Sequence, residues 1–209
     1  MPGLKRHVHF DDNSSPTSSS SSLPSSDGPI TPPPHGFGSP YHPTSLSLME
    51  SNAYVNPILA TSNRSFDFDI SKSPTSITYY ATLSKSVWEQ PATQPAAHSM
   101  VVVCDRLPWV LTILPGGNQQ GYVTVWDFIH GLYSSLRQSV SKTEFSTLSP
   151  EGQDAVAMAY KNRCKYFFEA SQYDAEMMKG VKRVDFLVGH SIFSGIKIGK
   201  GGRWDLMVR

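Results

Sequence analysis

The sequence has little charge, almost no cysteine and no long apolar run. Charged residues make up 17% of the 209 residues and the formal net charge is +1, so the chain lacks the basic surface that nucleic acids or anionic membranes require. Its two cysteines, Cys104 and Cys164, are too few for a disulfide scaffold. No apolar run approaches the roughly 18 residues of a membrane span, and no secretory signal follows the early basic pair. We therefore expect no nucleic acid or membrane partner, and a cytoplasmic or nuclear location.

Serine and proline, by contrast, are concentrated near the N-terminus. Residues 13–51 contain too little apolar surface to offset the entropy lost on ordering. Within them, Pro32 to Pro34 favour an extended polyproline conformation. We therefore predict a disordered Ser/Pro-rich leader over residues 1–53 and a single domain over residues 54–209.

Short segments rich in β-branched and aromatic residues predict the strands of this domain. The clearest pair is Met100 to Cys104 and Trp109 to Leu114, which are apolar on both faces, as buried strands are. Alternation of apolar and acidic residues predicts another strand over Phe66 to Ile70. Further strand candidates are Ile77 to Leu83, the segment around Val87 and Trp88, Val184 to Val188, Ile192 to Ile198 and Trp204 to Val208.

Three helices are predicted between these strands, each from a start signal. Thr124 with Asp127, and Ser141 with Glu144, have the spacing of a capping box. The third helix begins at Ser149-Pro150-Glu151, which combines an N-cap, a proline at the first helical position and an early acid. Its predicted buried face holds Val156, Ala159, Tyr160, Cys164, Phe167 and Phe168, whereas Lys161, Arg163 and Lys165 are expected to point mostly away.

A polar loop is predicted over Ala170 to Gly180, before the chain returns to strands. The order of strands, helices and strands indicates an α+β fold. We expect an antiparallel sheet packed against about three helices, preceded by the disordered leader. The glycine-rich loop from Gly195 to Gly202 lacks the hydroxyl residue and the following helix of a phosphate-binding loop, so a hairpin turn is favoured.

Few residues of the domain suit catalysis or metal binding. A small enzyme with a site between sheet and helices could use His130, Cys104 or Asp127, but Cys104 lies in a predicted strand and His130 on the flank of a helix. We expect neither a cofactor nor a metal site. The leader contains four possible metal ligands, His7, His9, Asp11 and Asp12. The domain contains no second pair of ligands at the spacing of a zinc site.

The leader contains a short interaction pattern over Arg6 to Phe10, RHVHF. It matches the pattern by which regulatory proteins dock on protein phosphatase 1: a basic residue, a spacer, Val or Ile, any residue, then Phe or Trp. In β-augmentation an extended segment pairs with an edge strand and alternate side chains enter apolar pockets. This assigns partner binding to Arg6, Val8 and Phe10, unless Val8 and Phe10 cover an edge of the domain's own sheet. Proline-directed phosphorylation candidates are Ser15, Thr31, Ser39 and Ser73.

Several segments resemble a family of basidiomycete fungal proteins that share a domain of unknown function. The resemblance covers nearly the whole chain and implies a fungal, intracellular, single-domain protein without known catalytic residues or cofactor. Its strongest segments are PWVLTI at Pro108 to Ile113, VTVWD at Val123 to Asp127, LYSSLR at Leu132 to Arg137, RVDFL at Arg183 to Leu187, FSG at Phe193 to Gly195 and WDL at Trp204 to Leu206. Further similar segments are VNPILA at Val55 to Ala60, FDFDI at Phe66 to Ile70 and, in the leader, KRHVHF at Lys5 to Phe10 and LPSSDGPITPPP at Leu23 to Pro34.

We therefore expect a non-enzymatic adaptor that binds a protein partner, with a phosphatase as the candidate. The alternatives are the small enzyme described above and a structural protein that assembles with itself. The sequence leaves the oligomeric state open.

Overall fold

The computed structural model describes residues 8, 10, 53–61, 68–75, 84–117, 121–166 and 170–209. The chain divides into two units, Met1–Asn13 with Ala53–Arg209, and Ser14–Asn52. Apart from Val8, Phe10 and Ala53, the predicted disordered leader lies outside the described residues, as does the strand predicted over Ile77 to Leu83. The boundary between leader and domain stays a prediction.

A five-stranded sheet forms the centre of the first unit, in the order β2-β6-β7-β4-β5. Every neighbouring pair is antiparallel except β4 and β7, which run parallel. The predicted α+β class and the two antiparallel pairs β4–β5 and β6–β7 are confirmed. The strands are β2 (Phe68–Asp69), β4 (Met100–Val103), β5 (Leu111–Ile113), β6 (Ile192–Ile198) and β7 (Trp204–Val208), and a separate two-stranded sheet pairs β1 (Tyr54–Val55) with β3 (Thr93–Gln94).

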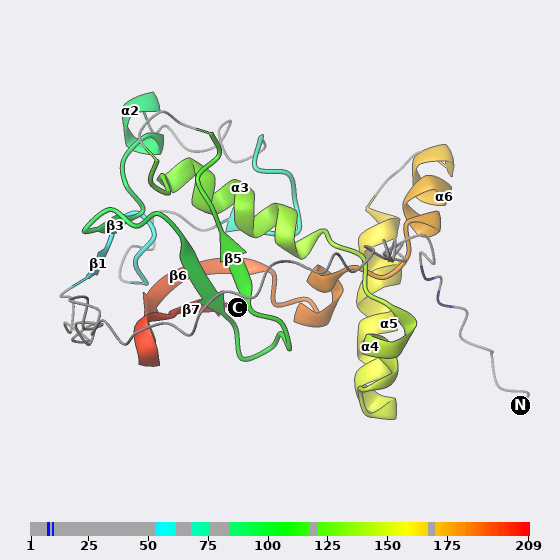
Figure 1. Ribbon diagram of the computed structural model, residues 1–209. Helices are drawn as coiled ribbons and strands as arrows, with labels where there is room; N and C mark the ends of the chain where they lie inside the picture. The colour runs from blue at the N-terminus through cyan, green and yellow to red at the C-terminus, as the bar shows by residue number, and fades with distance from the viewer. Residues whose placement is uncertain are drawn as a thin grey trace, which may run out of the picture. The chain divides into compact units, whose positions relative to one another are not determined.

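Helix α3 (Val125–Leu136) lies beside β5 of this sheet (Figure 1). The hydroxyl of Thr124 accepts the backbone N–H of Asp127, and the carboxylate of Asp127 accepts the N–H of Thr124, so the predicted capping box is present. Gly131 permits the close approach of helix to sheet, because a Cβ at this position would lie 2.8 Å from the side chain of Ile113. The face that α3 buries contains Val125, Phe128, Ile129, Leu132 and Leu136.

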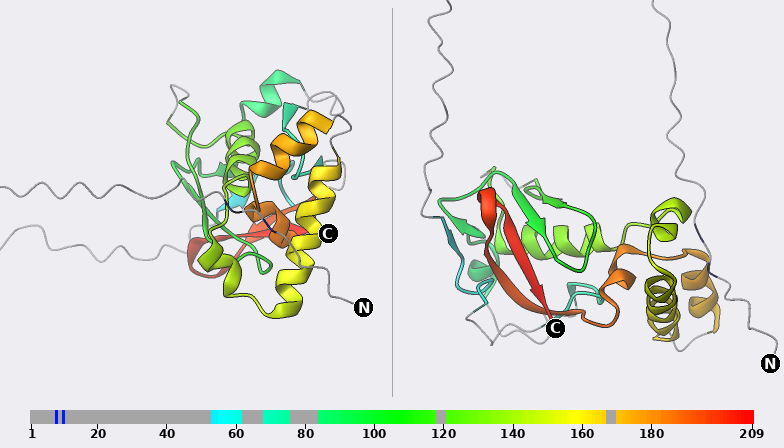
Figure 2. Two further views of the ribbon diagram at one scale, coloured as in Figure 1. Left: turned by 90° about the vertical axis from the view of Figure 1, so that its right-hand side faces the viewer. Right: turned by 90° about the horizontal axis from the view of Figure 1, so that it is seen from below.

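Helices α4 (Lys142–Ser146), α5 (Pro150–Lys165) and α6 (Ala170–Met178) form a group to one side of the sheet (Figures 1 and 2). The first two begin at Ser141 and Ser149, as predicted, with a hydroxyl that accepts a backbone N–H of the first turn. The 3-10 helix η1 (Arg183–Leu187) packs against α5 and leads into β6. A short turn, η2 (Lys200–Gly202), joins β6 to β7, so the glycine-rich loop is a hairpin connection.

Two predicted strands are helical in the structure. The segment around Val87 and Trp88 forms α2 (Lys85–Trp88), and the predicted strand over Val184 to Val188 forms η1. The second prediction was wrong because the carboxylate of Asp185 accepts the N–H of Lys182 and caps a helical turn. Since this turn is buried almost throughout, its apolar residues show no helical period that the sequence could reveal.

The predicted loop over Ala170 to Gly180 and the predicted exposure of Arg163 were also wrong. Most of the first segment forms α6, and Arg163 turns its side chain inward from α5. Both errors have one cause: α6 buries the charged residue Glu176, which Arg163 neutralises. An apolar stripe is therefore not required for this helix to pack.

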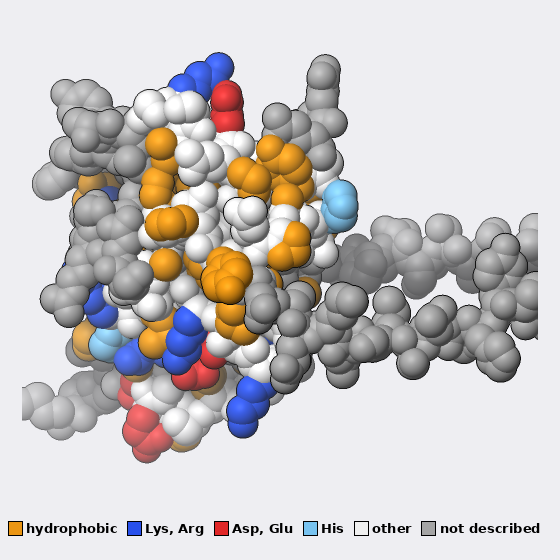
Figure 3. Space-filling model, turned by 90° about the vertical axis from the view of Figure 1, so that its left-hand side faces the viewer, with side chains coloured by type: hydrophobic (Ala, Val, Ile, Leu, Met, Phe, Trp, Pro, Cys, Tyr) orange, Lys and Arg blue, Asp and Glu red, His pale blue; other side chains and the backbone are white. Residues whose placement is uncertain are grey.

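Figure 3 shows the face of the unit that carries β1, β3 and the β6–β7 hairpin. On this face, hydrophobic side chains lie among uncharged ones, and most charged side chains lie near the top and in the lower part of the view (Figure 3). In the part of the chain that the structure describes, no helix is both long and apolar enough to cross a bilayer.

Candidate functional site

Arg163 lies at the centre of a buried ion network that joins α5, α6 and η1. Its guanidinium donates two hydrogen bonds to Asp185, from Nε to Oδ1 at 2.7 Å and from Nη2 to Oδ2 at 3.0 Å. Nη1 donates to Oε1 of Glu176 at 2.5 Å. These three side chains are only 2–8% exposed. Their burial is tolerated because each charge is paired and hydrogen-bonded.

Glu176 also forms ion pairs with two further cations beside this network. Lys179 donates to its carboxylate at 2.9 Å, and Nη1 of Arg137 lies 3.4 Å from it. Burial by itself raises the pKa of Glu176, but the hydrogen bond from Lys179 and the charges of Arg163 and Arg137 outweigh burial and hold this pKa below its usual value. Glu176 is therefore ionised at neutral pH and holds α6 to α5.

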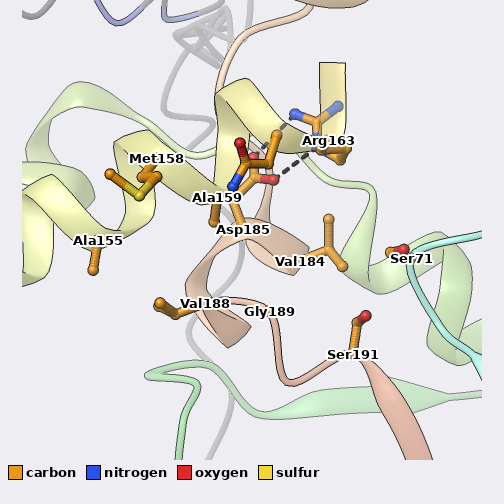
Figure 4. Close-up of a pocket in the computed structure, with 11 residues that line it drawn as sticks. Ser71, Ala155, Met158, Ala159, Arg163, Val184, Asp185, Val188, Gly189 and Ser191 are labelled. Atoms are coloured by element: carbon orange, nitrogen blue, oxygen red, sulfur yellow. Dashed lines mark hydrogen bonds and ion pairs between the residues drawn. The ribbon is translucent and has the colours of Figure 1, made fainter. Parts of the chain in front are cut away.

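A cleft of about 370 Å³ opens beside the network, between α5 and the chain that follows it from Val184 to Ser191 (Figure 4). We call it the apolar cleft. Met158 on α5 and Val188 after η1 contribute hydrophobic side chains that are 67% and 42% exposed. The Arg163–Asp185 pair forms a neutral polar wall. The other described residues that line the apolar cleft are Ser71, Ala155, Ala159, Asn162, Val184, Gly189 and Ser191.

Val188 has a strained backbone. Its φ of 49° and ψ of 49° are left-handed, a conformation that costs a β-branched residue about 1–3 kcal/mol. The turn is closed by hydrogen bonds on both sides, since Val188 donates to the carbonyl of Asp185 at 3.1 Å and His190 donates to that of Leu187 at 2.9 Å. The fold thus keeps an apolar side chain at the edge of the cleft where a glycine would be unstrained.

A second cleft of about 570 Å³ adjoins the first and shares Ser71, Asn162 and Arg163 with it. We call it the cationic cleft, because Lys72 and Arg137 line it together with Arg163. Its remaining described lining is Asp69, Ser73, Tyr133 and Tyr166.

The two described residues of the docking pattern, Val8 and Phe10, lie partly buried against the core of the same unit. The ring of Phe10 meets the ring of Phe145 in α4 edge to face, with 5.3 Å between the centroids. Neither residue is part of a strand. The contact is therefore with a helix, and the added edge strand considered from the sequence is not observed at these two positions. Arg6 lies outside the described residues.

The candidate catalytic residues occupy structural positions. Asp127 caps α3, as described above. Cys104 and Cys164 are both buried, and burial is the main cause that raises the pKa of each thiol, which makes them poor nucleophiles at neutral pH. The ring centroids of His130 and Trp126 lie 4.1 Å apart, and burial lowers the pKa of His130 despite the nearby charge of Asp127.

Of the other sequence candidates, Ser73 is the phosphorylation candidate that the structure describes. It is exposed, and its hydroxyl lies 2.8 Å from that of Thr75. Ser15, Thr31 and Ser39 lie outside the described residues. Within the described ranges, no group of three or more His, Cys, Asp or Glu residues is placed to hold a metal ion.

Comparison with known protein families assigns the domain to one of them. The model of the family described as "Family of unknown function (DUF6699)" matches residues 66–203. The chain belongs to this family. The match includes both clefts and the ion network, whereas Val8 and Phe10 precede it. No curated protein and no solved structure matches the chain.

Within the DUF6699 region, sequence reasoning missed Arg163, Glu176 and Asp185. One signal for Asp185 was available, since an acid inside the apolar run VDFLV must be paired if that run is buried. The partner could not be named, because Arg163 lies 22 residues away and has several basic neighbours on α5.

Proposed function

We propose that this protein is a non-enzymatic adaptor whose domain binds a partner protein through the apolar cleft. The observation that carries this function is the exposed pair Met158 and Val188 at the cleft, the second held there at the cost of backbone strain. Strained residues that persist in a fold are concentrated at binding and catalytic sites.

The lining of the apolar cleft defines the chemistry of the partner segment. Because Arg163 and Asp185 neutralise each other, the described lining of the cleft carries no net charge. Asn162 and Ser191 line the cleft with side chains that can form hydrogen bonds. An uncharged extended segment that inserts one apolar side chain, with its backbone hydrogen-bonded to these polar groups, is the occupant that this surface fits.

The leader supplies the second contact of the proposed adaptor. In β-augmentation, Val8 and Phe10 would enter apolar pockets of a partner, with a phosphatase of the type that recognises this pattern as the candidate. The same side chains are packed on the domain, Phe10 against Phe145. A partner must displace this packing to bind the leader. A basidiomycete fungal origin and a cytoplasmic or nuclear location are part of the same proposal, and they rest on the resemblance of the sequence segments.

Two methionines provide a matched test of the apolar cleft. Met158→Asp places a charge in the cleft, whereas Met178→Asp places one on α6, outside the cleft lining, at nearly equal exposure, 67% against 65%. Proteins co-purifying from a fungal extract are compared for both variants, and each candidate is then reconstituted from purified components. A direct partner bound by Met178→Asp and lost by Met158→Asp is expected. Equal binding by both variants would exclude the cleft as the docking surface.

The leader is tested with the purified catalytic subunit of protein phosphatase 1. Val8→Ala/Phe10→Ala should abolish binding. Phe145→Leu should tighten it about 2- to 10-fold, because an aromatic pair worth about 0.5–1.5 kcal/mol no longer holds the segment on the domain. If Val8→Ala/Phe10→Ala binds as the wild type does, or if no variant binds, the leader does not dock on this phosphatase. The cleft proposal would be unaffected.

A further inference from the structure

The cationic cleft has the size and composition of an anion site. Its volume of about 570 Å³ falls within the range of small-ligand pockets, roughly 300–1,000 Å³. Among the described residues, three cations, Lys72, Arg137 and Arg163, line it together with one carboxylate, Asp69. Arg163 is already committed to two buried carboxylates, so the chemistry of this site depends on the other two cations.

The ionic contacts of Lys72 and Arg137 are longer than those of Arg163. The ammonium of Lys72 lies 3.7 Å from Asp69, beyond the length of a good hydrogen bond. Arg137 donates from Nε to the hydroxyl of Tyr133 at 3.2 Å and from Nη1 to Glu176 at 3.4 Å. Their side chains are 44% and 23% exposed. Both can therefore turn towards a stronger acceptor in the cleft.

Ser73 lines the same cleft, next to Lys72 in the chain, and precedes Pro74. We propose that Ser73 is a phosphorylation site and that Lys72 and Arg137 bind its phosphate within the cationic cleft. A separate proline-directed kinase transfers the group from a nucleoside triphosphate. Oγ of Ser73 forms a bond to the γ-phosphorus, the bond to the bridging oxygen breaks, the nucleoside diphosphate leaves, and the hydroxyl proton passes to the kinase base.

The phosphate would join elements that meet at the two clefts. It carries a charge of about −1.5 to −2 at pH 7 and can accept charge-assisted hydrogen bonds from both cations. Ser73 belongs to the segment that follows β2, whereas Arg137 follows α3. Since Ser71 lines both clefts, the bound phosphate would also fix one wall of the apolar cleft. This inference does not depend on the adaptor function.

Because Pro74 is buried, a kinase needs the segment to open before it can act. The full-length chain is therefore made with phosphoserine incorporated at position 73 during synthesis. Compared with unmodified protein, we expect its midpoint of thermal unfolding to rise by about 3–6 °C. By ³¹P NMR, the second pKa of the phosphate should fall by about 1 from its usual value near 6, because two cations stabilise the dianion.

The control variants are Lys72→Gln and Arg137→Gln. Each is measured with and without the phosphate, so that only the rise in the unfolding midpoint caused by the phosphate is compared. Both the thermal increment and the lowered phosphate pKa should shrink in each variant. Thr75→Glu and Ser73→Glu place equal charges two residues apart, and Thr75 does not line the cleft, so stabilisation is expected for Ser73→Glu alone. A phosphate that titrates near 6 in the wild type, or an increment unchanged by both glutamine variants, would overturn the proposal.

Discussion

Replacing Arg163 with methionine should remove about 3–5 kcal/mol of folding free energy, because it leaves buried carboxylates without their main partner. The two carboxylates, Asp185 and Glu176, have side chains that are only 2% and 4% exposed. Methionine is unbranched and adapts to the space left by the arginine stem, so most of the loss reflects the missing charge. For a domain of this size the midpoint of thermal unfolding should fall by about 6–20 °C.

The loss is expected to come mainly from Asp185. Glu176 keeps Lys179 and Arg137 as partners, whereas Asp185 loses both hydrogen bonds of the guanidinium fork and keeps the N–H of Lys182. The double variant Arg163→Met/Asp185→Asn removes the orphaned charge while retaining an acceptor for Lys182. It should therefore be no less stable than Arg163→Met alone.

Urea unfolding followed by circular dichroism measures these differences by linear extrapolation. Lys165→Met, on the exposed side of the same helix, should unfold close to the wild-type midpoint. The reasoning would be refuted if Arg163→Met lost less than about 1 kcal/mol. It would also be refuted if the loss in the double variant equalled the sum of the two single losses, since that sum requires independent side chains.

Three further substitutions and the pH dependence of unfolding test other parts of the structure. Val188→Gly should stabilise the fold by about 0.5–2 kcal/mol in urea unfolding, since glycine relieves the left-handed strain, while it weakens binding of any cleft partner. Gly195→Ala should cost about 2 kcal/mol or more, because at a φ of 111° its Cβ would lie 2.6 Å from the backbone nitrogen of Thr61. Thr124→Ala should cost about 1 kcal/mol through loss of the α3 cap, seen as a lower urea midpoint. The lowered pKa of Glu176 contributes stability that is complete above its ordinary value of 4.5 and is lost as pH falls through the lower folded value, so thermal unfolding between pH 5 and 3 should show a slope that Glu176→Gln reduces.

Features that depend on neighbouring residues could be predicted from the sequence. Thr124 and Asp127 are three positions apart, and their capping box needs only the local turn. The strands β4 and β5 are joined by a short connection, so an apolar pair of segments there indicates a hairpin. By the same reasoning, the starts of α4 and α5 were found correctly.

Features that bring distant segments together could not be predicted in this way. The parallel pairing of β4 with β7 joins residues about a hundred positions apart. The burial of Arg163 on α5 depends on the carboxylates of Glu176 and Asp185, which lie 13 and 22 positions further along the chain. The spacing of apolar residues along the sequence does not reveal such distant partners, so Arg163 could not be distinguished from the other basic residues of α5.

The sequence by itself determined the starts of α3, α4 and α5, the hairpin strands, the α+β class and an alternating Val8–Phe10 pair that needs an apolar surface. Tertiary structure decided where that pair packs, which charges are buried and how Val188 is held at the cleft. Local geometry sets the first group through hydrogen bonds and side-chain spacing within a few residues. Burial sets the second group, because whether a charge or a strained backbone can be kept depends on the groups that the whole fold places around it.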